Sequence, residues 1–299
     1  MKHDAYRGRF APSPSGPLHF GSLIAALGSY LDAKHQNGTW LVRMEDIDTP
    51  RTVPGAADNI LRTLECFGLH WDEPIIYQSQ RIAAYETALH HLKTSANAYL
   101  CACTRKEIID SGLHGIEGQI YPGTCRNALP SGREGRAWRV RTNNFPIEFD
   151  DAIQGRITQH LESDIGDFVI KRADGLFAYQ LAVVVDDAFQ DITHVVRGAD
   201  LVISTPRQIH LQRLIDLPTP AYLHLPAALN RQGEKLSKQT LAQAVDTNSP
   251  AKLLTEALRF LQQHPPQELS DYDVASILSW AIEHWDKKAI IGVKNFTCN

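Results

Sequence analysis

Apolar residues recur at helical spacing over residues 19–35, where leucines four positions apart fall on one face. Asn37 and Gly38 follow and are typical of the end of a helix. The next stretch, TWLVRMEDID at 39–48, alternates apolar and polar positions as a half-buried strand does. With the apolar start RF before it, the chain predicts strand, helix, strand, with parallel strands and a ligand site at their carboxyl ends.

The pattern further along predicts an α/β nucleotide-binding fold that is interrupted once. Two helices are expected at about 54–67 and 80–95, and a strand at AWRVRT. The α/β pattern resumes at DFVIKRADGLFAYQLAVVV, where Asp174 and Gly175 predict a tight turn between strands. We expect a first half of the catalytic domain, an inserted subdomain, a second half and a small helical C-terminal region, at residues 1–97, 98–160, 161–240 and 241–299.

Composition narrows the class of protein. The chain has 299 residues, 43% of them hydrophobic, and a formal net charge of −4, so a nucleic-acid partner would need a local basic face. The longest aliphatic run, LAVVV at 181–185, is too short to cross a bilayer, and the N-terminus has no apolar signal core. We therefore expect a cytoplasmic protein that does not bind membranes. The five cysteines are an odd number, which argues against a disulfide framework.

Two short stretches predict nucleotide chemistry when they are taken together. Residues 9–22, RFAPSPSGPLHFGS, form a proline-stiffened turn at a helix N-terminus, where unpaired N–H groups attract an anion. Gly21 lets a base or phosphate approach the backbone, and His19 and Ser22 add donors. In KLSKQ at 235–239, two lysines could close on a polyphosphate. Taken singly, the first stretch is an ordinary loop and the second a solvated one.

These stretches resemble the signatures of a known family. HFGS is similar to the "HIGH" signature and KLSKQ to the "KMSKS" signature of class I aminoacyl-tRNA synthetases. RFAPSPSGPLHFG, followed by LVRMEDIDTPR, closely resembles the glutamyl branch of that class. The chain ends soon after the lysine loop, without the long anticodon-binding region of a full glutamyl enzyme. It is therefore similar to the shortened paralogues of the branch, which transfer glutamate to queuosine at the first anticodon position of tRNA(Asp).

The resemblance implies a Rossmann-type catalytic domain that joins L-glutamate to ATP and then passes the acyl group to tRNA. It implies catalytic roles for five residues: His19, Gly21, Ser22, Lys235 and Lys238. His19, Gly21 and Lys238 would bind ATP, with Mg²⁺ bridging the phosphates. Ser22 and Gln239 stand where the signatures have His and Ser, and neither departure removes the catalytic lysine.

Glutamate has one ammonium and two carboxylate groups, so its site needs an anion and cationic or hydroxyl donors. Glu45 is the candidate for the ammonium group. The resemblance implies glutamate contacts at eight positions: Arg9, Phe10, Ala11, Pro12, Ser13, Glu45, Tyr179 and Arg197. Alone, each side chain could be a surface ion pair, a core aromatic or a solvated strand end, and the sequence does not assign either arginine to a particular carboxylate.

Three of the five cysteines, Cys101, Cys103 and Cys125, cluster in the predicted insertion. Structural zinc takes four tetrahedral ligands, so the fourth could be His114, His91, water or Tyr121. The resemblance implies Tyr121 and one structural Zn²⁺ per chain. The alternative is three small buried thiols without a metal. Cys66 lies on a predicted helical face and is expected to be an inert core residue.

The leading hypothesis is thus a monomeric, tRNA-independent glutamate-activating enzyme directed to queuosine. A minimal glutamyl-tRNA synthetase acylating a tRNA 3′ end is an alternative from the same class. A non-catalytic tRNA-binding relative and an adenylate-forming ligase for small molecules are the others. The lack of an anticodon-binding region argues against the minimal glutamyl-tRNA synthetase. The full set of glutamyl motifs argues against the non-catalytic relative and the small-molecule ligase.

Overall fold

The computed structural model describes residues 5–229, 243–293 and 295–297. Its first unit is the predicted strand, helix and strand: β1 (Arg7–Phe10), α1 (Phe20–His35) and β2 (Thr39–Met44). The strands are parallel, with Arg7 opposite Thr39 and Phe10 opposite Val42. Asn37 takes a left-handed φ of 52° just beyond α1, as the predicted helix end requires.

Four further parallel strands continue this sheet in space. The strand β3 (Ile76–Tyr77) pairs with β2, and β11 (His194–Gly198) pairs with β12 (Ala221–Leu225), which pairs with β8 (Pro146–Asp151). The two groups meet at β1, because the Thr193 N–H beside β11 donates to the Arg7 carbonyl at 3.0 Å. β1, β2, β11 and β12 end at one edge, which is where open α/β sheets bind ligands, whereas β8 ends beside the start of β12.

Helices cover the sheet at the predicted places. The helices expected at 54–67 and 80–95 are α2 (Ala56–Cys66) and α3 (Ile82–Thr94), and two more follow in the second half, α6 (Tyr179–Phe189) and α7 (Thr205–Leu214). Short 3-10 helices connect several elements: η1 (Thr49–Arg51), η2 (Gln78–Gln80), η3 (Ala199–Ser204), η5 (Gln267–Asp271) and η6 (Lys287–Ile290).

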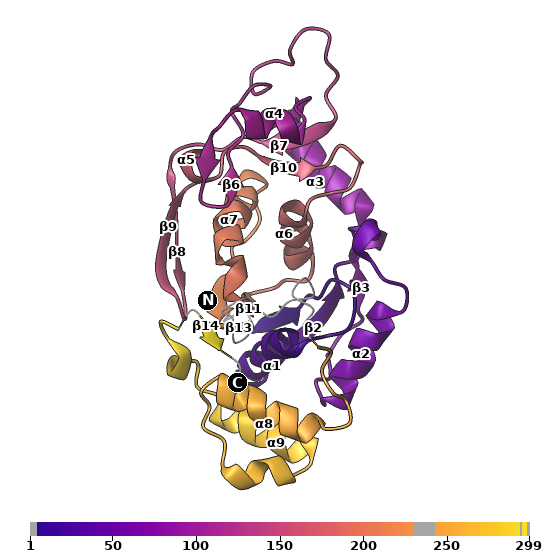
Figure 1. The fold of residues 1–299 in the computed structure, drawn as a ribbon, viewed down its shortest axis with the longest axis vertical. Helices are drawn as coiled ribbons and strands as arrows, with labels where there is room; N and C mark the ends of the chain where they lie inside the picture. The colour runs from indigo at the N-terminus through magenta and orange to yellow at the C-terminus, as the bar shows by residue number, and fades with distance from the viewer. Residues whose placement is uncertain (1–4, 230–242, 294, 298–299) are drawn as a thin grey trace.

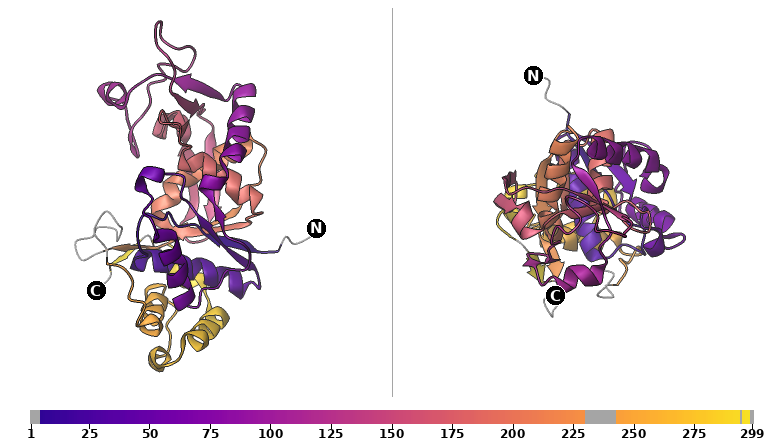
Figure 2. Two further views of the ribbon diagram at one scale, coloured as in Figure 1. Left: turned by 90° about the vertical axis from the view of Figure 1, so that its right-hand side faces the viewer. Right: turned by 90° about the horizontal axis from the view of Figure 1, so that it is seen from above.

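The first part of the segment 98–160 extends away from the main sheet, and its last part contributes strands to that sheet. Its outer part forms one end of the elongated molecule (Figures 1 and 2). That part contains β4 (Ala98–Cys101), α4 (Arg105–Asp110), β5 (His114–Gly115), β6 (Gly118–Gln119) and β7 (Ala137–Val140). The predicted strand AWRVRT is β7, which lies between β4 and β10 (Phe168–Lys171). The hairpin of β8 and β9 (Gly155–His160) joins the main sheet, and α5 (Leu161–Asp164) follows.

Two local predictions are wrong. The turn at Asp174 and Gly175 does not join two strands: the chain returns only for a single bridge between Lys171 and Phe177 and then enters α6. The apolar run that suggested a strand lies in this helix, where tertiary packing outweighs β propensity. Cys66 is exposed at the end of α2 and is not a core residue, because α2 is amphipathic and buries Ile60 and Leu64 instead.

The C-terminal region shares its core with the first unit. The helices α8 (Pro250–Phe260) and α9 (Val274–His284) pack on α1, and β14 (Asn295–Thr297) pairs with β13 (Ala227–Leu229). Asp32 of α1, almost fully buried, accepts hydrogen bonds from the Tyr6 hydroxyl at 2.6 Å and from Trp285 Nε1 at 2.9 Å. Within the described residues, no helix has both the length and the apolar character to span a membrane.

Replacing Trp285 by phenylalanine should lower the free energy of unfolding by about 1–3 kcal/mol, since it removes a donor from a buried carboxylate. Urea denaturation measures this loss. Trp280→Phe is the control, because Trp280 is only partly buried and stacks on His284. Equal losses in the two variants would show that Asp32 does not anchor the C-terminal region.

Candidate active site

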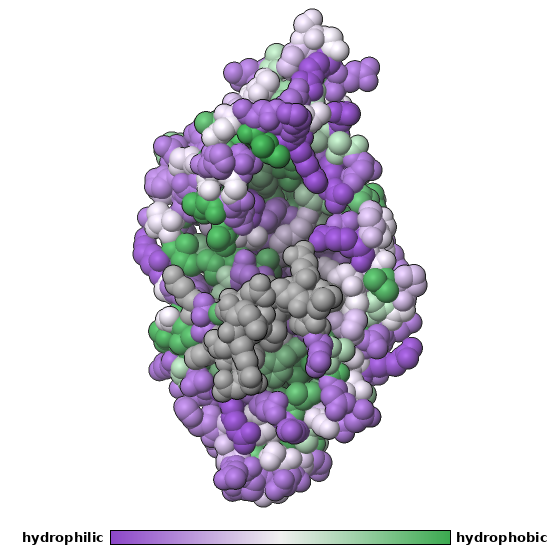
Figure 3. Space-filling model, viewed as in Figure 1, coloured by the Kyte–Doolittle hydropathy of each residue, from purple (hydrophilic) through white to green (hydrophobic). Residues whose placement is uncertain are grey.

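A pocket of about 1120 Å³ opens at the carboxyl ends of β1, β2, β11 and β12. The face of the molecule seen in Figure 3 is hollowed, with hydrophilic and hydrophobic residues side by side around the hollow. The pocket is lined by all the candidate nucleotide and glutamate residues that the structure describes: Arg9, Phe10, Ala11, Pro12, Ser13, His19, Gly21, Ser22, Glu45, Tyr179 and Arg197. Lys235 and Lys238 lie outside the described residues.

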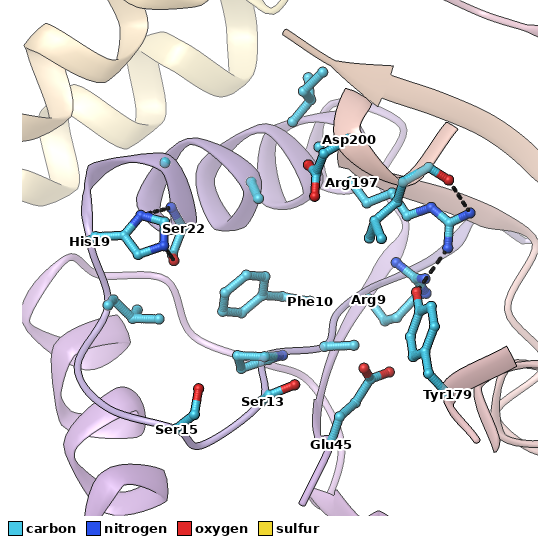
Figure 4. A pocket seen from close by; sticks show the side chains of 18 of the residues that line it. Arg9, Phe10, Ser13, Ser15, His19, Ser22, Glu45, Tyr179, Arg197 and Asp200 are labelled. Atoms are coloured by element: carbon cyan, nitrogen blue, oxygen red, sulfur yellow. Dashed lines mark hydrogen bonds between the residues drawn. The ribbon is translucent and has the colours of Figure 1, made fainter. Parts of the chain in front are cut away.

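One end of the pocket is the N-terminus of α1 (Figure 4). His19 caps this helix: its Nδ1 accepts the Ser22 N–H at 3.2 Å, and its Nε2 lies 3.1 Å from the Ser22 hydroxyl. The preceding loop is fixed to the sheet, because the Glu45 N–H donates to the Pro12 carbonyl at 3.0 Å. A 16-residue helix that points its positive end into a pocket favours an anionic ligand there.

The other end of the pocket carries buried charges (Figure 4). The Glu45 side chain is only 8% exposed, and its Oε1 lies 3.4 Å from Arg43 Nη2. Burial raises the pKa of Glu45 to about 7, although Arg43 and Arg9 oppose the shift. A ligand ammonium group at this carboxylate would restore its charge, so the site is suited to bind a cationic group.

Arg9 is held by a carboxylate that the sequence analysis missed. Its Nε donates to Asp187 Oδ1 at 3.1 Å, and Arg43 Nη2 donates to the same oxygen at 2.7 Å. Burial opposes ionisation of Asp187, but the two guanidinium groups hold its pKa below its usual range. The neighbouring Asp186 accepts from Gln78, Tyr85 and Arg81. Two adjacent aspartates next to the apolar run of α6 could have indicated these ion pairs in the sequence, because a buried carboxylate needs a cationic or hydrogen-bonding partner.

Arg197 and Tyr179 form a pair of donors at the same end. Arg197 Nη1 donates to the Tyr179 hydroxyl oxygen at 3.1 Å, which leaves the hydroxyl proton available to a ligand. Burial raises the pKa of Tyr179, so the hydroxyl stays protonated. A guanidinium N–H and a hydroxyl side by side match the two oxygens of a carboxylate.

The cysteine cluster is a separate centre, and none of its residues lines the pocket. The sulfurs of Cys101, Cys103 and Cys125 lie within 4.8 Å of one another, and Cys103 Sγ is 3.7 Å from Cys125 Sγ. The Tyr121 hydroxyl lies 3.4 Å from Cys101 Sγ and 3.7 Å from Cys103 Sγ. Tetrahedral zinc with Zn–S bonds of about 2.3 Å needs S···S edges of about 3.8 Å and S···O edges of about 3.5 Å, so the four groups fit such an ion.

Neither of the two candidate histidines lies at this cluster. His114 is exposed in β5, and its two ring nitrogens lie near the Gly112 carbonyl and the Gln119 amide. His91 is exposed in the last turns of α3. Burial raises the pKa of the Cys101 thiol, but hydrogen bonds from Tyr121 and Arg139 outweigh it and hold the pKa below its usual value. This environment favours the thiolate at Cys101, whereas burial raises the pKa of the Cys103 thiol.

Comparisons with known proteins agree with this geometry. The model of the family "tRNA synthetases class I (E and Q), catalytic domain" matches residues 5–258. The "Glutamyl-Q tRNA(Asp) synthetase" of Dechloromonas aromatica is 61% identical over 95% of each chain, and that of Chromobacterium violaceum is 54% identical over 95% of each. The chain belongs to the glutamyl-Q tRNA(Asp) synthetase family. The resemblance to the shortened glutamyl branch and the assignment to class I ligases are thereby confirmed.

The fold is shared with longer enzymes. The glutamate-tRNA synthetase of Elizabethkingia anophelis superposes with a TM-score of 0.79 at 23% identity, over 99% of this chain and 68% of the other. This likeness confirms the α/β class I synthetase fold. The two glutamyl-Q tRNA(Asp) synthetases named above, by contrast, are covered over 95% of their own length.

Proposed function

We propose that the protein activates L-glutamate with ATP, without tRNA, and transfers the glutamyl group to queuosine at the first anticodon position of tRNA(Asp). The observation that carries the proposal is the pocket: a helix N-terminus at one end and a buried set of carboxylate, guanidinium and hydroxyl groups at the other. Its volume of about 1120 Å³ exceeds what glutamate alone would fill, which leaves room for a nucleotide. The names of the relatives support the tRNA substrate. We also propose that the reaction takes place in the cytoplasm, where a tRNA substrate would be met.

In the proposed first step, an oxygen of the glutamate α-carboxylate attacks the α-phosphorus of ATP, and pyrophosphate leaves. No protein nucleophile is needed, so the residues contribute positioning and charge. Glu45 would bind the ammonium group, and Arg9, Arg197 and Tyr179 would bind carboxylate oxygens. His19, Gly21 and Ser22 would hold ribose and phosphates, and the two lysines of KLSKQ would approach the phosphates. Mg²⁺ bound with ATP would neutralise phosphate charge.

In the proposed second step, a hydroxyl of the queuosine cyclopentene-diol attacks the acyl carbon of the adenylate. The new ester bond forms, AMP leaves, and the hydroxyl proton is released. We also propose that one structural zinc ion is held by Cys101, Cys103, Tyr121 and Cys125, where it would fix the outer segment without taking part in the chemistry.

Labelled glutamate and purified tRNA distinguish the proposal from its alternative. We expect label on tRNA(Asp) that carries queuosine, and equal label after its 3′-terminal adenosine has been removed. The same tRNA(Asp) with guanosine in place of queuosine should stay unlabelled. Label on intact tRNA(Glu) that is lost with its terminal adenosine would instead identify a minimal glutamyl-tRNA synthetase. No label on any tRNA, and no glutamate-dependent exchange of pyrophosphate into ATP, would favour a non-catalytic relative.

A further inference from the structure

A line of buried polar side chains crosses three neighbouring strands behind the charged end of the pocket. Arg197 of β11 is opposite His224 of β12 in the parallel register, and Asp151 ends the adjacent strand β8. Asp151 Oδ2 lies 2.6 Å from His224 Nδ1, and Arg197 Nε lies 3.1 Å from His224 Nε2. The side chains of Asp151 and His224 are fully buried. Neither residue belongs to a recognised motif of the sequence.

The donors and acceptors fix the state of the imidazole. An ionised carboxylate only accepts, so His224 Nδ1 carries the proton that it donates to Asp151. A guanidinium only donates, so His224 Nε2 must offer its lone pair to Arg197. His224 is therefore neutral, and burial, which holds the pKa of His224 below its usual value, acts in the same direction. Asp151 is fixed in turn by the N–H groups of Ile153 and Gln154, at 3.0 and 2.8 Å.

This arrangement leaves Arg197 one orientation. Its Nη2 donates to Thr205 Oγ1 at 2.7 Å and to the Leu201 carbonyl at 3.4 Å. Nε is taken by His224, and one N–H of Nη1 by Tyr179. Of the five N–H groups of the guanidinium, four thus have partners among the described residues. Nη1, which bears the fifth, lies beside the Tyr179 hydroxyl, and both residues line the pocket (Figure 4).

We infer that Asp151 and His224 are positioning residues, which orient the Arg197 guanidinium so that Nη1 and the Tyr179 hydroxyl together bind a carboxylate of glutamate. The inference rests on the proposed function for the identity of the ligand. A freely rotating arginine would lose side-chain entropy on binding, whereas one held by the Asp151–His224 pair has lost it already. Neither Asp151 nor His224 lines the pocket, so the pair would act on a ligand through Arg197, which also donates to Thr205 beside His224 Nε2.

Two substitutions of His224 distinguish loss of the hydrogen bond that orients Arg197 from the general effect of changing a buried residue. Glutamine places its amide near the position of Nε2, so its oxygen can still accept from Arg197. Asparagine places its amide near the position of Nδ1, so it keeps Asp151 and loses Arg197. In pyrophosphate exchange we expect His224→Asn to raise the KM for glutamate about tenfold or more, as loss of a hydrogen bond to a charged group would. His224→Gln should raise it less than about threefold, and neither should change the KM for ATP by more than about twofold.

His210 provides the matched control. It is buried on α7, its Nε2 lies 2.7 Å from the Arg141 carbonyl oxygen, and it does not line the pocket. His210→Asn should leave the KM for glutamate within about twofold of wild type, whatever it does to Tm. If both His224 variants change the KM values for glutamate and ATP alike, or if neither changes them, the inference is overturned.

An arginine ¹⁵N–¹H spectrum tests the hydrogen bond without any substrate. We expect a slowly exchanging Arg197 Nε–H signal in the wild type and in His224→Gln, and fast exchange in His224→Asn. An enzyme that fails to activate glutamate would reject the proposed function, and this spectrum would still decide the inference: slow exchange retained in His224→Asn overturns it.

Discussion

Glu45→Gln is expected to raise the KM for glutamate about a hundredfold while changing the KM for ATP less than about threefold. The substitution keeps the size of the side chain and its contact with Arg43 Nη2, and it removes only the negative charge. Because the carboxylate is only 8% exposed, water cannot replace the charge that the substrate ammonium group would lose. Pyrophosphate exchange at varied glutamate and varied ATP measures both constants.

The acidity of Glu45 adds a pH signature to this prediction. Burial raises the pKa of Glu45 to about 7, so the free enzyme gains a proton there as the pH falls below 7. Only the ionised form binds an ammonium group, so kcat/KM for glutamate should fall by up to about tenfold per pH unit below 7. In Glu45→Gln this dependence should disappear.

Stability shows whether the variant is folded. A carboxyl group whose pKa is raised in the folded state contributes stability below its unfolded pKa and loses it as the pH rises through its folded pKa. Wild type at pH 8 has lost that contribution, so Glu45→Gln should be no less stable there. Asp48→Asn is the matched control, since Asp48 lines the same pocket but is 22% exposed and paired with Arg51 and Arg172. If Glu45→Gln and Asp48→Asn raise the KM for glutamate equally, Glu45 does not bind the ammonium group.

The elements that could be predicted are those whose pattern is local. The period of apolar residues located α1, α2 and α3. Alternation located β2, but the strand is buried at every position from Trp40 to Met44 and is not half buried as expected. The helix α6 was missed for a physical reason. It is buried among α3, α7 and the strands of the outer sheet, so its apolar residues show no single face that distinguishes a helix from a strand.

The candidate site was predictable only in its motif residues. Arg9, Glu45 and Arg197 were found because they stand in recognisable stretches at strand ends. Their partners were not, because Asp187 and His224 reach them from other parts of the chain, and such long-range pairs leave no local pattern. Sequence patterns thus located the groups that face the pocket, and the structure was needed to find the buried groups that hold them.

The wild-type protein is expected to hold about one zinc ion per chain, and Cys101→Ser is expected to hold none. The substitution should also lower Tm by about 10 °C. The reason is the size of the core around the cluster. It consists of Tyr99, Cys101, Ala102, Tyr121 and Cys125 with a few partly buried neighbours, so a metal would supply stability that apolar burial does not. Metal analysis of freshly purified protein and thermal unfolding measure the two effects.

Cys66→Ser is the matched control for this experiment, since Cys66 is exposed on α2, outside the cluster. It should keep its zinc and change Tm by less than about 2 °C. Because none of the four proposed ligand groups lines the pocket, Cys101→Ser should retain pyrophosphate exchange below its Tm and lose transfer to tRNA. If Cys101→Ser has the same zinc content and Tm as Cys66→Ser, the three thiols form a cluster without a metal. Loss of pyrophosphate exchange in a folded Cys101→Ser protein would instead place the metal in the activation step.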